Sequence, residues 1–221
     1  VTNHEKIQRY PAVNLKKLQI INPIDMKTAF FLSFMILLTS TLLGQNIDFG
    51  FNDSIQSKVL NENRKFIVKL PPEYNNSDKS YPVIYRLDGD LDLYFETAGV
   101  INRLAHMEEI MPDMIVVMIE NTNRNRDMMP TNTSFFKTEP GAEIFKNFIE
   151  NELIPQINNT YRTTNEKLLC GQSLSAIFTL YYFLTSPDSF DSFIASSGGF
   201  PDCEEYFNKL TNDFLETKQT K

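Results

Sequence analysis

The stretch that most constrains the fold is residues 167–184, where a short apolar strand meets an apolar helix across Gly171-Gln172-Ser173. A nucleophilic serine needs such a sharp turn, because its Oγ must stand at the end of the sheet, beside the first N–H groups of the helix. Close approach of strand and helix requires small neighbours: Gly171 is one, but Ser175 stands where the G-x-S-x-G pattern has glycine, and its Cβ crowds the turn. We predict that Ser173 is a nucleophile; the alternative is that it only caps the helix.

A second segment of the chain fits the same chemistry. Pro82–Leu87 predicts a buried strand, and Asp88-Gly89-Asp90 follows it as a turn. In an α/β-hydrolase arrangement, the loop after this strand and the residue after the nucleophile each supply an N–H group to the oxyanion hole. The predicted oxyanion donors are therefore Leu174, Gly89 and Asp90. The alternative for the Asp88-Gly89 segment is an ordinary turn.

Apolar patterns elsewhere alternate between strand and helix. Met114–Ile119 is a continuous apolar run, typical of a strand covered on both faces, and Pro155 should kink or restart its helix. The predicted strands are 57–60, 64–70, 82–87, 114–119, 167–170 and 193–195, the predicted helices are 94–111, 144–157, 175–184 and 204–215, and the longest loop is 120–138. This order predicts an α/β fold with a mostly parallel central sheet and helices on both faces.

The first 45 residues differ in character from the rest. Met26-Lys27 precedes an uncharged run, Thr28–Leu43, which ends in small and polar residues. This layout is typical of a secretory signal peptide, so we predict one at 26–45 and an exported, periplasmic or secreted, protein; an uncleaved membrane anchor is the alternative. Residues 1–25 would then be a non-native upstream extension, and 46–221 the folded domain.

The charge of the chain excludes several classes of partner. The formal net charge is −7, and outside the first 45 residues the chain holds 16 basic and 26 acidic groups, a net of −10. Such an acidic domain has no electrostatic footprint for nucleic acid or for stable association with an anionic membrane surface. With two histidines and two cysteines no metal site is expected, and we expect Cys170 and Cys203 to stay unpaired.

Several segments in register resemble the Putative esterase family of α/β-hydrolases, which includes esterase D, enterochelin-type siderophore esterases and feruloyl esterases. The resemblance covers about 57–200 and is greatest to the enterochelin-esterase-like group. It rests on Arg64–Tyr74, Tyr81–Asp90, Arg124–Pro130, Phe148–Pro155, Gly171–Ala176 and Ser186–Asp191. The resemblance implies that Ser173 is the nucleophile and that Arg126 and Asp127 lie in a loop beside the active site, as candidates for substrate contact. The alternative for this Arg-Asp pair is a local ion pair that shapes the loop.

One component of the expected catalytic triad has no candidate. In this fold the order along the chain is serine, then an acid, then histidine, yet the two histidines, His4 and His106, both precede Ser173. The acids that follow the serine come too early for the acid loop. We interpret the chain as C-terminally incomplete, with the last strands of the sheet missing and the 193–195 strand left at an edge. We expect it to hydrolyse p-nitrophenyl acetate barely above background.

The sequence thus predicts a serine carboxylic-ester hydrolase that forms an acyl-enzyme on Ser173 and uses neither a metal nor an organic cofactor. Its predicted partner is a small-molecule ester, of the siderophore type or another. Two alternatives remain open: an acyltransferase of the same family, and a non-catalytic binding protein on the same fold.

Overall fold

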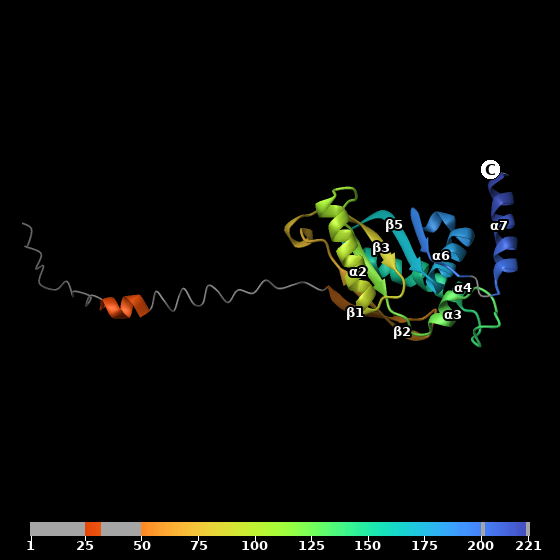
Figure 1. The fold of residues 1–221 in the computed structure, drawn as a ribbon, viewed down its shortest axis with the longest axis horizontal. Coiled ribbons are helices and arrows are strands. Elements are labelled where there is room, and N and C mark those ends of the chain that lie inside the picture. The colour runs from red at the N-terminus through yellow and green to blue at the C-terminus, as the bar shows by residue number, and fades with distance from the viewer. Residues whose placement is uncertain (1–24, 32–49, 200–201, 220–221) are drawn as a thin grey trace, which may run out of the picture. The chain divides into compact units, whose positions relative to one another are not determined.

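The computed structural model describes residues 25–31, 50–199 and 202–219 (Figure 1). The chain divides into two compact units, Val1–Asp48 and Phe49–Lys221. The division lies close to the predicted boundary after residue 45. The proposed upstream extension at 1–25 and most of the predicted signal peptide at 26–45 lie outside the described residues, so both stay predictions.

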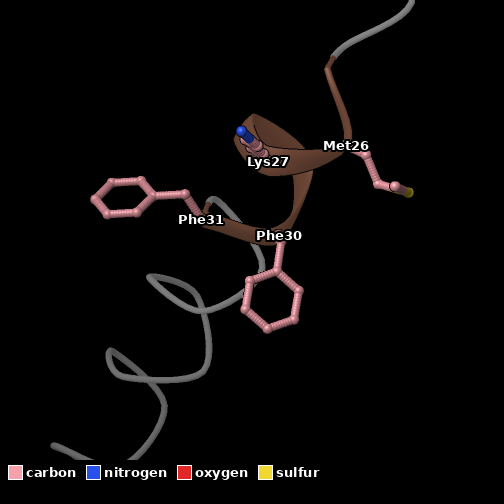
Figure 2. A pocket seen from close by; sticks show the side chains of 4 residues that line it. All are labelled: Met26, Lys27, Phe30 and Phe31. Atoms are coloured by element: carbon pink, nitrogen blue, oxygen red, sulfur yellow. The ribbon is translucent and has the colours of Figure 1, made fainter.

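The described part of the first unit is a short helix at 26–31. Figure 2 shows Met26, Phe30 and Phe31 pointing in different directions around an open hollow. All three side chains are exposed, and Lys27 is the one charged residue at the hollow. Because no set of polar groups converges there, the hollow has no feature of a binding site. Among the described residues, no helix is long and apolar enough to cross a membrane.

The second unit is built on a six-stranded sheet with the order β1-β2-β4-β3-β5-β6. The strands are β1 (Phe51–Ser57), β2 (Glu62–Lys69), β3 (Tyr81–Arg86), β4 (Ile115–Ile119), β5 (Thr163–Gln172) and β6 (Ser192–Ser196). β2 runs antiparallel to both β1 and β4, whereas β4, β3, β5 and β6 are parallel to one another. The predicted α/β fold with a mostly parallel sheet is confirmed.

Helices pack on both faces of this sheet. They are α2 (Leu91–Asn102) with its π-helical continuation η3 (Arg103–Met107), α3 (Arg124–Met128), α4 (Ala142–Phe148), the π-helical turn η4 (Ile149–Leu153), α5 (Ile154–Thr160), α6 (Leu174–Thr185) and α7 (Glu204–Gln219), with short 3-10 turns η2 (Tyr74–Asn76) and η5 (Pro187–Ser189). α2 lies across one face (Figure 1). The other face packs against α4, α5, α6 and α7.

Alternation along β3 shows how the two faces are built. Val83 and Tyr85 point into the larger core with α4, α5 and α6, whereas Ile84 points to the smaller core under α2. All five residues of β4 are buried, as expected of a strand covered on both faces. The carboxyl ends of these parallel strands lie together at one edge of the sheet, which is where open α/β sheets bind ligands.

Two predicted elements, the strand at 57–60 and the loop at 120–138, differ from the structure. The strand predicted at 57–60 is wrong, because β1 ends at Ser57 and the next residues form a turn. The Glu152 carboxylate accepts hydrogen bonds from the N–H groups of Lys58 and Val59, and Asn61 takes a left-handed φ of 52°. These contacts replace strand pairing. In the predicted 120–138 loop, the short helix α3 begins where the Asn123 side chain accepts from the Arg126 N–H.

Pro155 restarts its helix, as predicted. α4 passes into the π-helical turn η4, and α5 begins at Ile154, so that Pro155 lies in the first helical turn of α5. The backbone stays helical through Leu153 and Ile154, and the π-helical turn before Pro155 is the irregularity at which a proline without an N–H is accommodated.

β6 is the last strand of the sheet and pairs only with β5 among the described strands. The expectation that this segment forms an edge is confirmed, and its Ile194 side chain is 46% exposed. Cys170 on β5 is partly buried, Cys203 is buried, and the two are not joined by a disulfide.

Candidate active site

The predicted nucleophile occupies a strained turn between β5 and α6. Ser173 has φ 59° and ψ −121°, a conformation that non-glycine residues adopt only where the surroundings enforce it. Its side chain makes no capping hydrogen bond to α6, so the capping alternative is wrong. Its N–H donates to the Ser196 carbonyl on β6 at 3.0 Å. The turn therefore holds the Ser173 backbone and leaves its hydroxyl without a structural task in the helix.

Gly171 is required by the closeness of strand and helix. A Cβ at this position would lie 2.3 Å from the Ser175 carbonyl oxygen and 2.5 Å from Thr179 Oγ1. Both atoms belong to α6, whose first turn cannot move without displacing Ser173. The expectation that a small residue must stand two before the serine is confirmed.

Ser175 is accommodated by hydrogen bonding. The residue is fully buried, and its Oγ accepts from the Gln172 N–H at 2.8 Å. The hydroxyl proton has two acceptors at 2.8 Å, the Gln172 carbonyl oxygen and Asp88 Oδ2. The sequence indicated only that a Cβ here would crowd the turn. It gave no sign that the hydroxyl would join the turn to the end of β3.

Asp88 is the centre of a polar network that the sequence analysis treated as a simple turn. Arg124 binds its carboxylate with two hydrogen bonds, Nε to Oδ1 at 2.7 Å and Nη2 to Oδ2 at 2.8 Å, and Asn121 Nδ2 donates to Oδ1 at 2.8 Å. Burial acts to raise the pKa of Asp88, but the hydrogen bonds from Arg124, Asn121 and Ser175 outweigh it and leave the pKa below its usual value. Asp88 is therefore a buried, charged acceptor.

The predicted oxyanion donors differ in their present bonding. The Gly89 N–H donates to the Ile119 carbonyl at 2.7 Å, and the Asp90 N–H donates to the Asp88 carbonyl at 2.8 Å. Leu174 is the first residue of α6, where N–H groups have no intrahelical acceptor. The geometry favours Leu174 as a donor, whereas Gly89 and Asp90 would have to exchange an existing hydrogen bond. The oxyanion role of all three stays a prediction.

A cleft of about 420 Å³ opens beside the loop that follows β3. It lies at the carboxyl ends of β3 and β4. Its lining residues are Asn52, Ile67, Gly89, Asp90, Leu91, Glu120 and Asn121. A small ligand bound there would lie against the predicted oxyanion loop.

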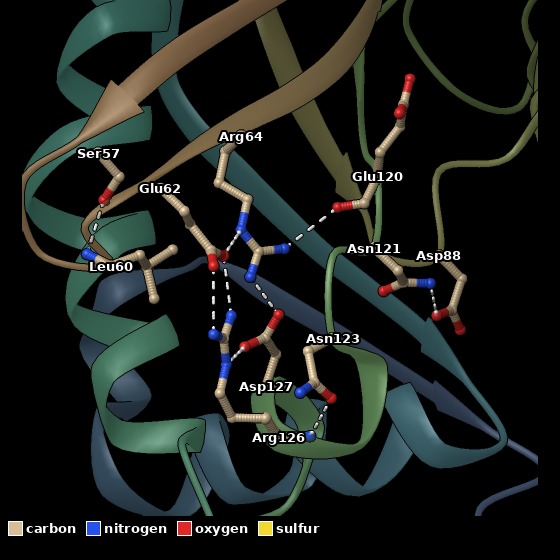
Figure 3. A network of polar contacts seen from close by, with 10 residues as sticks. All are labelled: Ser57, Leu60, Glu62, Arg64, Asp88, Glu120, Asn121, Asn123, Arg126 and Asp127. Atoms are coloured by element: carbon tan, nitrogen blue, oxygen red, sulfur yellow. Dashed lines mark hydrogen bonds and ion pairs between the residues drawn. The ribbon is translucent and has the colours of Figure 1, made fainter.

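The residues predicted to contact substrate belong to a buried cluster of charges (Figure 3). Asp127 is fully buried and accepts from Arg64 and, at 2.7 Å, from Arg126 Nε. Arg126 also donates to Glu62 from Nη2 at 2.8 Å, and this bond is the main reason why the pKa of Glu62 lies below its usual value. The Arg64 guanidinium lies 5.0 Å from the centre of the Phe145 ring. These contacts are those of the local ion-pair alternative, and substrate contact by Arg126 and Asp127 stays a prediction.

His106 does not reach this site. It lies in η3, where its Nε2 is 3.0 Å from Asp113 Oδ1. α2 begins next to Asp90 and runs away from the carboxyl edge of the sheet, which puts His106 roughly 20 Å from the turn at Asp90 at 1.5 Å per residue. Within the described ranges, no group of three His, Cys, Asp or Glu side chains is arranged to hold a metal ion.

Comparison with known proteins assigns the family. Residues 57–213 match the sequence profile of the family described as Putative esterase. The chain belongs to this family. It is similar to the ferri-bacillibactin esterase BesA of Bacillus subtilis, with 30% identity over 70% of this chain and 61% of BesA. It is also similar to the siderophore triacetylfusarinine C esterase of Aspergillus fumigatus, with 28% identity over 62% of this chain and 51% of that enzyme. The chain thus spans between half and two thirds of the length of these relatives.

Solved structures give the same fold. An IroE-like serine hydrolase from Shewanella oneidensis aligns with a TM-score of 0.70 and 28% identity, over 75% of this chain and 56% of its own. The siderophore hydrolase EstA from Aspergillus nidulans aligns with a TM-score of 0.67 over 79% of this chain and 65% of its own, at 19% identity. The α/β-hydrolase fold predicted from the sequence is confirmed.

Proposed function

We propose that the protein is a serine ester hydrolase in which Ser173 is the nucleophile. The observation that carries this proposal is the backbone at Ser173, which is held at a positive φ while the side chain makes no capping hydrogen bond. Strain of this kind collects at functional sites, where it presents a reactive atom. The turn also stands at the carboxyl ends of parallel strands, and the family is one of esterases.

The reaction follows from this geometry as an acyl transfer in two steps. Ser173 Oγ attacks the ester carbonyl carbon, and the oxygen that gains negative charge is stabilised by the N–H of Leu174 and by the loop at Gly89 and Asp90. Expulsion of the alcohol leaves an acyl-enzyme, which water then hydrolyses. These steps use neither a metal nor an organic cofactor. They do need a general base, and no histidine follows Ser173 in the sequence.

The substrate class that we propose is a small ester of the siderophore type. Two relatives are siderophore esterases, the ferri-bacillibactin esterase BesA and the siderophore triacetylfusarinine C esterase. The cleft beside Gly89 and Asp90 could receive part of such a ligand. Export through the segment at 26–45 would place the enzyme where siderophores are met, and it forms part of the same proposal.

Labelling with a fluorophosphonate probe tests the nucleophile. We expect slow labelling that maps to Ser173, is absent in Ser173→Ala, and is unchanged in Ser192→Ala, which removes an exposed hydroxyl on neighbouring β6. Hydrolysis of p-nitrophenyl acetate should be barely above background. Added imidazole should accelerate labelling of the unmodified protein, because it can act as the general base that the reaction needs. Equal labelling of the unmodified protein and Ser173→Ala would contradict the proposal.

The substrate class is tested by incubating the protein with ferri-bacillibactin or with triacetylfusarinine C, each in the presence of imidazole. Release of the ring-opened or shortened siderophore, dependent on Ser173, is the expected product. Transfer of the acyl group to an added alcohol in preference to water would indicate an acyltransferase. Binding without any Ser173-dependent product would indicate a binding protein.

A further inference from the structure

Gln172, the residue before Ser173, is held through both of its backbone polar groups. The Gln172 N–H donates to Ser175 Oγ at 2.8 Å, and the Gln172 carbonyl oxygen lies 2.8 Å from the same Oγ. Arg124 Nη2 also reaches this carbonyl, at 3.4 Å. Since the Gln172 carbonyl carbon is bonded to the Ser173 nitrogen, its orientation helps to set the φ of Ser173 and the direction of its Oγ.

The Ser175 hydroxyl is in turn fixed by a charged acceptor. Asp88 Oδ2 lies 2.8 Å from Ser175 Oγ, and the carboxylate is held by the two hydrogen bonds from Arg124 and the one from Asn121. This network connects the end of β3, the loop after β4 and α3 with the first turn of α6. Glycine at position 175 would offer none of these contacts.

The helix α3, which carries Arg124, is itself anchored by a second set of ion pairs. This helix has five residues, and its Arg126 and Asp127 pair with Glu62 and Arg64 on β2. Gly141 packs on it as well, with its N–H donating to the Arg126 carbonyl at 2.8 Å. α3 is therefore anchored to β2 by the ion pairs of Arg126 and Asp127. Its Arg124 contacts the turn at Ser173 through Asp88 and the Gln172 carbonyl.

We infer that Ser175, Asp88 and Arg124 are positioning residues for the nucleophile: they hold the Gln172 peptide and thereby keep Ser173 Oγ beside the first N–H groups of α6. The inference rests on the proposed function, because it takes Ser173 as the reacting residue. It also explains how this chain does without glycine at position 175. Where a glycine would let the backbones of β5 and α6 pack closely, the Ser175 hydroxyl instead connects Gln172 to Asp88 by hydrogen bonds.

A thiol placed at the reacting position tests the inference without any need for ester hydrolysis. In Ser173→Cys, the reactivity of the introduced thiol toward iodoacetamide depends on its thiolate fraction, which the N–H groups at the start of α6 increase. Peptide mapping by mass spectrometry separates alkylation at position 173 from that at Cys170 and Cys203. The rate at position 173 as a function of pH then reports the surroundings of the reacting atom.

Two double variants disrupt the connection between Ser175 and Asp88: Ser175→Ala and Asp88→Asn, each combined with Ser173→Cys. We expect the alkylation rate at pH 7 to fall roughly two- to fivefold, the range of a helix-terminus effect, and the pH profile to move to higher pH. The two substitutions together should do little more than either one, because they break the same connection.

Ser57→Ala is the matched control. Ser57 is also buried, and its hydroxyl donates to a carboxylate, that of Glu152, but the pair lies at the β1–β2 turn, away from α6. It should lower the melting temperature and leave the rate and pH profile at position 173 unchanged. An unchanged or increased rate in Ser175→Ala and Asp88→Asn would overturn the inference.

Arg124→Lys tests the same inference in case Ser175→Ala or Asp88→Asn fails to fold. It keeps the charge, loses the two-point contact with Asp88, and is partly exposed, so the protein should remain folded. The same fall in rate is expected, and a normal rate in this folded variant would overturn the inference. Persistent fluorophosphonate labelling in Ser173→Ala would instead contradict the proposed function, so the two failures are distinguishable.

Discussion

Two turns at the carboxyl edge of the sheet have the same backbone feature and use it differently. Asp88 follows β3 with a φ of 58°, and Ser173 follows β5 with a φ of 59°. The Asp88 carboxylate receives hydrogen bonds from three side chains, which offset the cost of its conformation. The Ser173 side chain makes no hydrogen bond to the helix that it begins. A residue whose backbone is strained and whose side chain makes no compensating hydrogen bond is the better candidate for a catalytic role.

The largest effect is expected from the glycines that bring each turn against neighbouring backbone. A Cβ at Gly171 would lie 2.3 Å from the Ser175 carbonyl oxygen, and one at Gly89 would lie 2.6 Å from the Met118 carbonyl carbon. Gly171→Ala and Gly89→Ala should each lower the free energy of unfolding by ~3 kcal/mol, measured by urea denaturation. The control is Gly99→Ala in α2, where a Cβ meets no atom within 4 Å and the stability should rise.

Substitution of the Asp88 side chain should lower stability much more than substitution of the Ser173 side chain. Asp88→Asn should lower the free energy of unfolding by ~2 kcal/mol, because Arg124 and Ser175 lose a charged acceptor. Ser173→Ala should change it by less than ~0.5 kcal/mol, because no capping hydrogen bond is lost. Urea denaturation of both variants at pH 7 measures the difference. Equal losses would show that the Ser173 hydroxyl has a structural task as well.

The contribution of Asp88 should depend on pH. Since its pKa is lowered in the folded protein, its ionised form stabilises the fold above the ordinary pKa of about 3.9, and this contribution is lost as the pH falls through the lower folded value. The stability difference between the unmodified protein and Asp88→Asn should therefore be full at pH 7 and shrink below about pH 4. A difference that is constant with pH would contradict a charged Asp88.

The smallest effect is expected where strain alone is relieved. Ser173→Gly removes the Cβ that disfavours a positive φ and should raise the free energy of unfolding by ~0.5 kcal/mol while abolishing labelling. Asp88→Gly relieves the same strain but should lower stability, because it also removes the carboxylate. Thermal melts of the two variants at pH 7 give opposite shifts if the comparison holds.

The sequence predicted the turn at Ser173 because the information is local. Gly171, the apolar strand before it and the apolar helix after it lie within 18 residues, and each has a known geometric task. The mostly parallel sheet with helices on both faces followed from the alternation of apolar strand and helix patterns, whereas the order of the strands in the sheet was not predicted. The strand at 57–60 was misplaced because Glu152, about 95 positions away, binds the turn there.

The network around Asp88 could not be found in this way. Its partners Asn121 and Ser175 lie 33 and 87 positions away along the chain, and they meet only after the parallel strands have paired. An Asp at the end of a buried strand and an Arg after the next strand are a weak signal in isolation. The position of the 193–195 strand at a sheet edge was predicted, but its pairing with β5 and its bond to Ser173 depend on strand order and register, which the sequence pattern leaves open.

The bond from the Ser173 N–H to the Ser196 carbonyl links the nucleophile to the least supported strand of the sheet. Terminal and edge segments open more often than interior ones, and amide hydrogen exchange measures that opening. The Ser173 amide should therefore exchange with deuterium at the rate at which β6 detaches from β5, faster than the Cys170 amide, whose residue bonds to the β3 side of the sheet. Any molecule that lengthens the residence of β6 on the sheet would slow the exchange at Ser173 without touching the serine.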